Sequence, residues 1–470
     1  MTKSASKNQV FSYIDEIFNR QMQNHWRQRQ TGVRERRGLL GRLEKWILAH
    51  RREIQDALSA DFGKPAFETD ISEIWATLTE IRHARKNLAR WMRPRKVKPT
   101  LVTLTATAWT EYQAKGVVLV ISPWNYPFQL AVVPLALALA AGNCVMIKPS
   151  EKTPRTSALL ERMATELFPP ELVAVVTGGV EVGMFLVGKA FHHIYFTGGS
   201  KVGRLIMKAA AENLSSVTLE LGGKSPFVVT ETANLKDAAQ KLAFLKFLNS
   251  GQTCIAPDYL LIHSHVKEKF LKILRSEFQN YPIDKKFRTE IIDESRVARL
   301  EALKEEALAK GAQKIPLLDA ADEADESIPL ILDNVRLDFQ IMGEEIFGPF
   351  LPVLTFDNLD EAIDIIRRIP SPLAIYLFTA NREEIRKVKS GTLSGGLVVN
   401  DVVFQYIHPN LPFGGVGESG IGRTHGLEGF AEFSNKRSFL KNYSFTPLKF
   451  FMPPLKGWKL KLVDWLIRWL

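Results

Sequence analysis

Continuous apolar runs alternate with amphipathic segments through residues 116–211. The apolar runs, which are typical of strands buried on both faces, are 116–121, 144–147, 172–176 and 193–196. Segments with helical spacing lie between or after them at 127–141, 156–167 and 202–211. This order predicts a parallel β-sheet with helices on both faces, so the expected fold class is α/β.

A second α/β unit follows over residues 225–400. Its apolar runs predict strands at 227–229, 259–262, 351–355 and 374–378, with surface loops at 280–289 and 319–327. Before the first unit, residues 9–60 and 68–92 have helical spacing with many charges, which indicates surface helices. Between those helices and the first strand, residues 97–113 alternate Thr and Val like a β-ribbon that leaves the main body.

The composition changes this picture little, being 46% hydrophobic and 24% charged with a net charge of +11. Much of the excess lies in residues 27–52, which we interpret as a solvated helix face, and in the C-terminal tail. The chain shows no zinc-finger spacing and no aromatic RNA-binding pattern, so we expect no nucleic acid partner. The absence of an apolar signal-peptide core and the two cysteines favour a reducing, cytoplasmic location.

The two cysteines differ in their surroundings. Cys144 lies inside a strand pattern and is interpreted as a small buried hydrophobe. Cys254 follows a small polar turn at 251–253, where a substrate can reach its thiol, and Glu220 ends an apolar run upstream. A reactive thiol with a nearby carboxylate suits covalent catalysis. The nine histidines show no metal-ligand spacing, so we expect no metal site.

A glycine turn closes the strand at 193–196 and opens the next helix. Gly198, Gly199, Ser200 and Gly203 let the backbone and the helix N-terminus approach a pyrophosphate, which indicates a dinucleotide site. The spacing departs from the usual dinucleotide fingerprint, and an ordinary tight turn is the alternative interpretation.

Two further polar positions follow predicted strands, at the edge where parallel sheets bind ligands. Lys148 and Glu151 can bond ribose hydroxyls, or they belong to an ordinary charged loop. Asn125 can donate its amide to an oxyanion, or it caps a turn.

Taken together in chain order, these motifs resemble the aldehyde dehydrogenase superfamily over nearly the whole sequence. The matching segments are Pro123-Trp124-Asn125, Lys148-Pro149-Ser150-Glu151, 196–203, Glu220-Leu221-Gly222-Gly223-Lys224, Gly251-Gln252-Thr253-Cys254, Glu344-Glu345-Ile346-Phe347-Gly348-Pro349 and Pro412-Phe413-Gly414-Gly415. Residues 124–127 and 254–259 look most like the class 3 branch, which includes fatty, aromatic and coniferyl aldehyde dehydrogenases.

The resemblance implies a Rossmann-like cofactor domain plus an α/β catalytic domain, with a small β oligomerisation arm. The implied division is 1–96 and 114–221 for the cofactor domain, 222–427 for the catalytic domain, 97–113 and 428–446 for the bridging segments, and 447–470 for an amphipathic tail. Class 3 likeness also implies a homodimer.

By the same resemblance, Cys254 attacks the aldehyde carbon and Asn125 holds the oxyanion. Loss of hydride leaves a thioester, and Glu220 or Glu345 activates the water that hydrolyses it to a carboxylic acid. Alternatives are a CoA-acylating or acyl-reducing relative, in which Glu220 would be missing, and a non-catalytic protein on the same fold. A non-catalytic protein could lose Cys254, Glu220 or Asn125, but all three residues are present in this chain.

The implied cofactor contacts are Lys148 and Glu151 at the adenosine ribose, the turn of Gly198, Gly199, Ser200 and Gly203, and Glu345 and Phe347 at the nicotinamide. The Glu151 carboxylate would repel a 2′-phosphate, which favours NAD, although class 3 relatives often accept NADP as well. Family members usually carry a side chain at the position of Gly199. Ser200 is still expected to cap the helix that follows.

The expected substrate is a medium- or long-chain or an aromatic aldehyde. Tyr126 and Phe413 are candidate pocket residues, although core packing explains aromatic side chains equally well. In the tail, Trp458, Trp465 and Trp469 accompany a narrow polar helix face. Such a helix suits contact with a membrane surface, or it covers the partner subunit or the substrate entrance.

Overall fold

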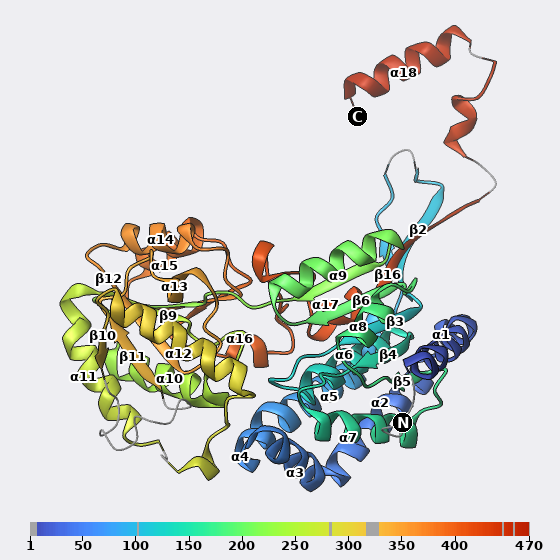
Figure 1. Ribbon diagram of the computed structural model, residues 1–470. Helices are drawn as coiled ribbons and strands as arrows, with labels where there is room; N and C mark the ends of the chain where they lie inside the picture. The colour runs from blue at the N-terminus through green and yellow to red at the C-terminus, as the bar shows by residue number, and fades with distance from the viewer. Residues whose placement is uncertain are drawn as a thin grey trace.

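Two α/β units lie side by side, and an arm projects from one of them (Figure 1). The computed structural model describes residues 7–100, 103–281, 284–315, 329–443, 446–454 and 456–469. Each unit is built on a mostly parallel sheet with helices packed against it, which confirms the predicted α/β class. The predicted loop at 319–327 lies outside the described residues.

The first sheet has the strand order β15-β7-β6-β3-β4-β5. Its members are β3 (Val117–Ile121), β4 (Cys144–Lys148), β5 (Val173–Val175), β6 (His193–Thr197), β7 (Ser216–Glu220) and β15 (Gly420–Ile421). All are parallel except β15, which pairs antiparallel with β7. Strands β4 and β5 are added on one side of β3, and β6 and β7 on its other side. The strand order therefore reverses between β3 and β6. Ligands of parallel sheets bind at such a switch point.

Helices cover both faces of this sheet. One face carries α6 (Gln129–Ala141), α7 (Pro154–Leu167) and α17 (Gly426–Glu432), and outside them lie α2 (Val33–Ala49), α3 (Arg51–Phe62) and α5 (Ala76–Trp91). The other face carries α1 (Lys7–Arg29), α8 (Val180–Val187) and α9 (Ser200–Glu212). Helix α6 is buried nearly all round between strands and helices, which explains its continuous apolar sequence. It begins after Phe128 rather than at Pro127.

The second sheet has the order β10-β11-β12-β9-β8-β13-β14, and every strand is parallel to its neighbours except β10. Its strands are β8 (Pro226–Val229), β9 (Tyr259–His263), β10 (Gln313–Ile315), β11 (Leu330–Asp333), β12 (Phe350–Phe356), β13 (Ala374–Phe378) and β14 (Gly396–Val399). Its helices are α10 (Leu235–Phe247), α11 (Lys267–Phe278), α12 (Glu294–Ala309), α13 (Gln340–Gly343), α14 (Leu359–Arg368), α15 (Arg382–Gly391) and α16 (Phe404–Ile407). The four strands predicted for this unit are all present.

The arm is a three-stranded sheet of β1 (Arg95–Val97), β2 (Ala106–Ala114) and β16 (Ser434–Asn442), with β2 in the centre. Strand β16 pairs antiparallel with all of β2, so the ribbon predicted at 97–113 is completed by a segment more than 300 residues later. Beyond it, helix α18 (Gly457–Trp469) stands clear of both units (Figure 1). No helix within the described ranges is long and apolar enough to cross a membrane.

Candidate active site

The predicted site residues lie where the carboxyl edge of the first sheet meets the amino edge of the second. In the first sheet, Glu220 ends β7 and Asn125 follows β3. In the second sheet, Cys254 precedes β9 and Glu345 precedes β12, which pairs with β9. Because neighbouring strands in each sheet are parallel, the loops at one edge lie together, and the two sets converge between the units.

Cys254 sits at the end of a tightly folded loop. After α10, the residues Asn249, Ser250 and Gly251 all have left-handed backbone angles, with φ of 54°, 51° and 71°. For the two non-glycine residues this conformation costs about 1–2 kcal/mol each, so surrounding contacts must hold it. Gly251 allows the loop to approach Gly348, because a Cβ added at residue 251 would lie only 2.2 Å from the carbonyl oxygen of Gly348. This loop conformation places Cys254 between the two units.

The side-chain amide of Asn125 reaches this loop. Its Nδ2 donates to the carbonyl oxygen of Gln252 at 3.0 Å, two residues before Cys254. Its backbone carbonyl accepts from Asn249 Nδ2 at 3.2 Å and from Lys64 Nζ at 2.9 Å. The predicted oxyanion donor is thus fixed beside the thiol by hydrogen bonds to both its side chain and its backbone.

Lys64 and Glu73 form a fully buried ion pair beneath Asn125, with Nζ and Oε1 2.7 Å apart. Glu73 Oε2 also accepts the backbone N–H of Gln129 at 2.8 Å, which ties the pair to the start of α6. Sequence reasoning did not select either residue, since both lie among the many charges before residue 92. Nothing local distinguishes them from surface charges, because their burial depends on packing against the loop after β3.

Glu220 and Cys254 line one small cavity of about 20 Å³, which is enough for a single water molecule. Its other walls are mainly apolar or aromatic, and they include Tyr195, Tyr406 and His425. Both carboxylate oxygens of Glu220 are buried without a hydrogen-bond partner in the described part of the chain. Burial raises the pKa of Glu220 well above its ordinary value, against a lowering influence from Arg423.

Cys254 has an environment that favours the protonated thiol. Burial raises its pKa, and the carboxylates of Glu345 and Glu220 raise it further. Burial also raises the pKa of Glu345 to about 8, with a contribution from Asp258. Two carboxyl groups whose pKa values are raised by burial therefore lie close to the thiol, and either can take part in proton transfer with it.

Glu345 and Phe347 lie on the loop before β12. Glu345 packs against Gly222, where an added Cβ would lie 2.0 Å from Oε2, so any side chain at position 222 would have to displace the Glu345 carboxylate. Phe347 faces Trp124 edge-on with ring centroids 5.4 Å apart. The backbone N–H of Ile346 donates to Asp258 at 2.8 Å, which connects this loop to the one that follows Cys254.

At the carboxyl end of β4, Lys148 forms an ion pair with Glu151 at 2.5 Å. Partial burial opposes ionisation of Glu151, but the Lys148 ammonium holds its pKa below the ordinary value. Lys148 is nearly buried and Glu151 half exposed, so the carboxylate remains available to a ligand at this edge of the sheet.

The glycine turn lies between β6 and α9, as predicted. Gly198 packs on Phe196, and Gly203 packs on Leu221, where a Cβ would lie 2.8 Å from Cδ2. The expectation that Ser200 caps α9 is wrong: Gly199 occupies the capping position, and no side chain caps the helix. Ser200 is already helical, and its hydroxyl donates to the carbonyl oxygen of Glu418 at 3.0 Å.

The two candidate pocket residues have different positions. Phe413 lines the cavity with Cys254, whereas Tyr126 is not among the residues that line it. The Tyr126 hydroxyl is 2.6 Å from Thr253 Oγ1, and Lys64 Nζ lies over its ring at 4.1 Å. Tyr126 therefore supports the Cys254 loop from behind.

Sequence reasoning also missed His425, whose ring contacts the rings of both Tyr406 and Phe413. Burial lowers its pKa to about 3, with a further contribution from His83, so this ring is neutral. In the sequence, the feature that could have drawn attention to His425 is its position just after the glycine-rich segment 414–422. That segment packs beside the end of β7.

The fold and the converging thiol, amide and carboxylates define a nicotinamide-dependent oxidoreductase that acts on aldehydes. Residues 4–439 match the family model described as the aldehyde dehydrogenase family, so the chain belongs to that family. It is an NAD(P)-dependent enzyme that oxidises aldehydes to carboxylic acids.

Within the family, the chain falls in the class 3-like branch. It is 41% identical over 424 residues to aldehyde dehydrogenase family 3 member H1 of Arabidopsis thaliana, covering 89% of this chain and 87% of the relative. It is 40% identical over 436 residues to coniferyl aldehyde dehydrogenase of a Pseudomonas species, covering 91% and 90%.

Solved structures have the same fold. A substrate-bound state of Staphylococcus aureus AldH matches with a TM-score of 0.91 at 37% identity, over 97% of this chain and 99% of that one. An indole-3-acetaldehyde dehydrogenase in complex with NAD⁺ matches with a TM-score of 0.83 at 26% identity, over 93% and 88%.

Proposed function

We propose that Cys254 is the nucleophile of this aldehyde dehydrogenase and that Asn125 and Glu220 assist it. The observation that carries the proposal is the shared cavity of Cys254 and Glu220, beside a loop to which the Asn125 amide is bonded. The thiolate sulfur attacks the aldehyde carbon, and the carbonyl oxygen becomes an oxyanion that accepts from Asn125 Nδ2. To donate to the oxyanion, the Asn125 amide would exchange its hydrogen bond to the Gln252 carbonyl for one to the substrate oxygen.

The carboxyl groups of Glu220 and Glu345 are the candidates that accept and release protons during the reaction. Because burial keeps the thiol protonated, its proton must pass to a nearby base before attack. Glu220 suits this role in its ionised form, since neither of its oxygens is engaged by another described group. After the hydride has left and a thioester has formed, the carboxyl group releases the thiol proton to solvent, and the regenerated carboxylate removes a proton from the attacking water. Glu345 is the alternative base, with its pKa near 8.

The carboxyl edge of the first sheet, beside the switch point, suits a dinucleotide cofactor. Helix α9 begins without a side-chain cap, and a Cβ at Gly199 would meet nothing within 4 Å, which leaves its first N–H groups open to a phosphate. Exposed apolar side chains of Val180 and Met184 on α8 and of Val202 on α9 offer a flat surface to a base. When bound, the nicotinamide supplies the hydride acceptor.

NAD is the preferred cofactor in this proposal. The Glu151 carboxylate, held ionised by Lys148, would repel the 2′-phosphate of NADP. Comparing kcat/KM for NAD and NADP in the parent enzyme and in Glu151→Gln tests this. We expect the parent enzyme to have a higher kcat/KM with NAD than with NADP, and this ratio to be smaller in the variant. A clearly higher kcat/KM with NADP in the parent enzyme would contradict the NAD preference.

The substrate is an apolar aldehyde of medium or long chain, or an aromatic one. The cavity at Cys254 is lined by Leu130, Val133, Tyr406 and Phe413, whose side chains suit an alkyl chain or a ring. A relative at 40% identity carries the name coniferyl aldehyde dehydrogenase, which agrees with an aromatic substrate. Since the cavity itself is water-sized, its aromatic walls must move apart when a substrate enters.

The experiment that tests the proposal compares the two cysteines. Cys254→Ala should abolish oxidation of hexanal, decanal, benzaldehyde and coniferaldehyde while the unfolding temperature is retained. Cys144→Ala is the matched control: that thiol is buried, with its pKa raised by burial, and its variant should keep activity while losing some stability. Turnover by Cys254→Ala at the parental rate would contradict the role of Cys254 as the nucleophile.

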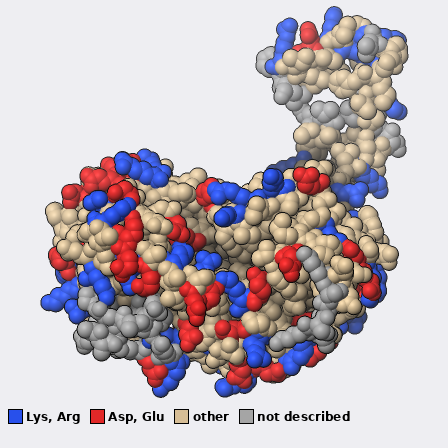
Figure 2. Space-filling model, viewed as in Figure 1, with Lys and Arg blue, Asp and Glu red and all other residues tan. Residues whose placement is uncertain are grey.

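Two further parts of the proposal concern the assembly. The chain forms a homodimer through its three-stranded arm, since β16 has no further partner strand among the residues that the structure describes and its side chains are mostly exposed. Helix α18 contacts a membrane surface. It exposes Trp458, Leu460, Trp465 and Ile467, and Figure 2 shows basic side chains around it.

A further inference from the structure

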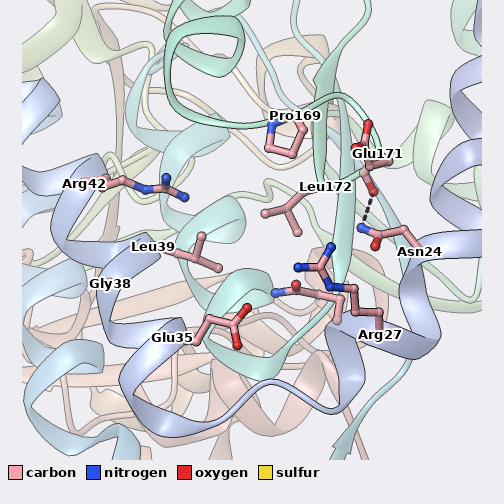
Figure 3. Close-up of a pocket in the computed structure, with 10 residues that line it drawn as sticks. Asn24, Arg27, Glu35, Gly38, Leu39, Arg42, Pro169, Glu171 and Leu172 are labelled. Atoms are coloured by element: carbon pink, nitrogen blue, oxygen red, sulfur yellow. Dashed lines mark hydrogen bonds between the residues drawn. The ribbon is translucent and has the colours of Figure 1, made fainter.

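A second cavity, of about 490 Å³, is shown in Figure 3. It lies at the opposite end of the first sheet from the active site. It is formed by α1, α2 and the turn that enters β5 at Leu172, on the amino edge of that sheet. Lys148 and the other cofactor candidates lie at the carboxyl edge. The volume is in the range of small-molecule sites, and neither the catalytic mechanism nor the proposed cofactor contacts involve this cavity.

Two arginines reach toward this cavity, Arg27 from α1 and Arg42 from α2 (Figure 3). Within the described ranges, neither guanidinium has an ion pair with a carboxylate; Arg42 only lies over the ring of Phe168 at 5.5 Å. A guanidinium presents a planar fork of donors that matches the two oxygens of a carboxylate. The pair therefore offers an unfilled anion site rather than a set of structural ion pairs.

A third polar group of the wall is Gln28, whose side chain is 6% exposed. Its Nε2 has no hydrogen-bond partner in the described part of the chain. A buried amide without a partner is costly, so an acceptor supplied by a ligand would satisfy it.

The empty volume is preserved by a glycine. Gly38 lies in the middle of α2 and lines the cavity, and a Cβ added there would meet nothing within 4 Å. Glycine destabilises a helix interior relative to alanine, and here no close packing requires it. A larger side chain at this position would project into the cavity and fill it.

The remaining wall is mixed. Leu39, Leu172 and Pro169 form an apolar side. Glu171 is neutralised by Arg20, with which its Oε2 makes a 2.5 Å contact, whereas Glu35 opposes an anion. The charges that remain leave a positive excess next to an apolar surface.

We propose that this cavity binds a small carboxylate with an apolar chain, held by Arg27 and Arg42 with its chain along Leu39 and Leu172. Acids formed by aldehyde oxidation have this chemistry, so the cavity would take a product at a second site. The proposal does not depend on which residue is the nucleophile, so it can fail or succeed independently of the mechanism above.

Octanoate binding to the full-length protein, measured by isothermal titration calorimetry, tests the proposal. Arg27→Gln and Arg42→Gln should each weaken binding about tenfold, as expected for a lost charge-assisted contact. Gly38→Met should abolish it, and Glu35→Gln should strengthen it about two- to fivefold by removing a like charge. Arg34→Gln is the matched control, because that arginine is exposed on the same helix and does not line the cavity.

Gly38→Ala keeps the space and favours the helix, so it should fold and retain binding, which separates blocking of the cavity from misfolding. Equal octanoate affinity in Arg27→Gln, Arg42→Gln and the parent would place the ligand elsewhere and overturn the proposal. Binding of inorganic phosphate or octan-1-ol as tightly as octanoate would overturn the ligand chemistry.

Discussion

At the scale of single residues, Asn125 has little freedom to move. Its amide donates to the Cys254 loop, and its backbone carbonyl accepts from Lys64 and Asn249. A donor held in this way gains its catalytic value from being placed before the oxyanion forms.

We therefore expect Asn125→Ala to lower kcat by about 10²–10³, the usual loss for one oxyanion donor. Steady-state rates with decanal, at saturating cofactor, measure the effect. The unfolding temperature serves as the control, since the backbone bonds at this position remain. A loss below about threefold would show that the amide is not an oxyanion donor.

Glu220→Gln should separate the two halves of the reaction. Attack and hydride loss can still proceed with another base, while hydrolysis loses the group that activates water. We expect a burst of reduced cofactor close to one equivalent per site, followed by turnover slowed about 10²–10⁴-fold. Stopped-flow absorbance measures both phases. Glu212→Gln, at the exposed end of α9, is the control, and an unchanged steady-state rate in Glu220→Gln would assign the base role to Glu345.

At the scale of elements, Glu80 connects α5 to the start of α17. It is buried, accepts the backbone N–H of Gly426 at 3.2 Å, and lies 3.6 Å from the neutral ring of His425. Burial raises its pKa from 4.5 to about 7. Between those values the folded protein binds more protons than the unfolded chain, so the free energy of unfolding falls as pH rises through this window.

Glu80→Gln should remove this dependence, since an amide keeps the acceptor and does not ionise. The slope for one such group approaches about 1.4 kcal/mol per pH unit. Unfolding temperatures at pH 5, 6, 7 and 8 should therefore fall more steeply in the parent than in the variant. Parallel curves for the two proteins would show that Glu80 does not titrate in this range.

Helix α18 stands apart from both α/β units (Figure 1). Its tryptophans are anchors suited to the headgroup region, and its lysines favour anionic lipids. We expect the full chain to float with vesicles containing phosphatidylserine, and a chain ending at residue 453 to stay at the bottom of the gradient. Trp26→Ser, at an exposed tryptophan of α1, should float like the parent. Equal flotation with and without the tail would remove the membrane contact from the proposal.

At the scale of the whole molecule, the arm offers the surface through which two copies would join. Leu440 on β16 is 61% exposed, which is costly in a monomer and suits an interface. Leu440→Glu should shift the protein from dimer to monomer in light scattering coupled to size exclusion, at micromolar concentration. Leu48→Glu changes an equally apolar exposed residue on α2 and should remain dimeric. A monomeric parent would contradict the assembly itself.

The pattern of the chain was enough to predict β3, β4, β5 and β6 of the first sheet and β8, β9, β12 and β13 of the second, because strands buried on both faces must be continuously apolar. It did not predict β10, β11, β14 or β15. The ribbon at 97–113 was also predicted, but not its pairing with β16, which depends on a contact across more than 300 residues. The cap of α9 was mispredicted, because a serine near a helix start fits several positions and only the observed hydrogen bond to Glu418 decides among them.

The sequence by itself determined the chemical groups and their order: one thiol in a polar turn, one amide and two carboxylates after or before apolar strands. It did so because residue types and local periodicity are properties of neighbouring residues. Only the tertiary structure decided that Lys64 and Glu73 lie beneath Asn125, that Glu220 and Cys254 share one cavity, and that Arg27 and Arg42 reach toward another. Burial, pKa and cavities arise from elements distant along the chain, and no local pattern records them.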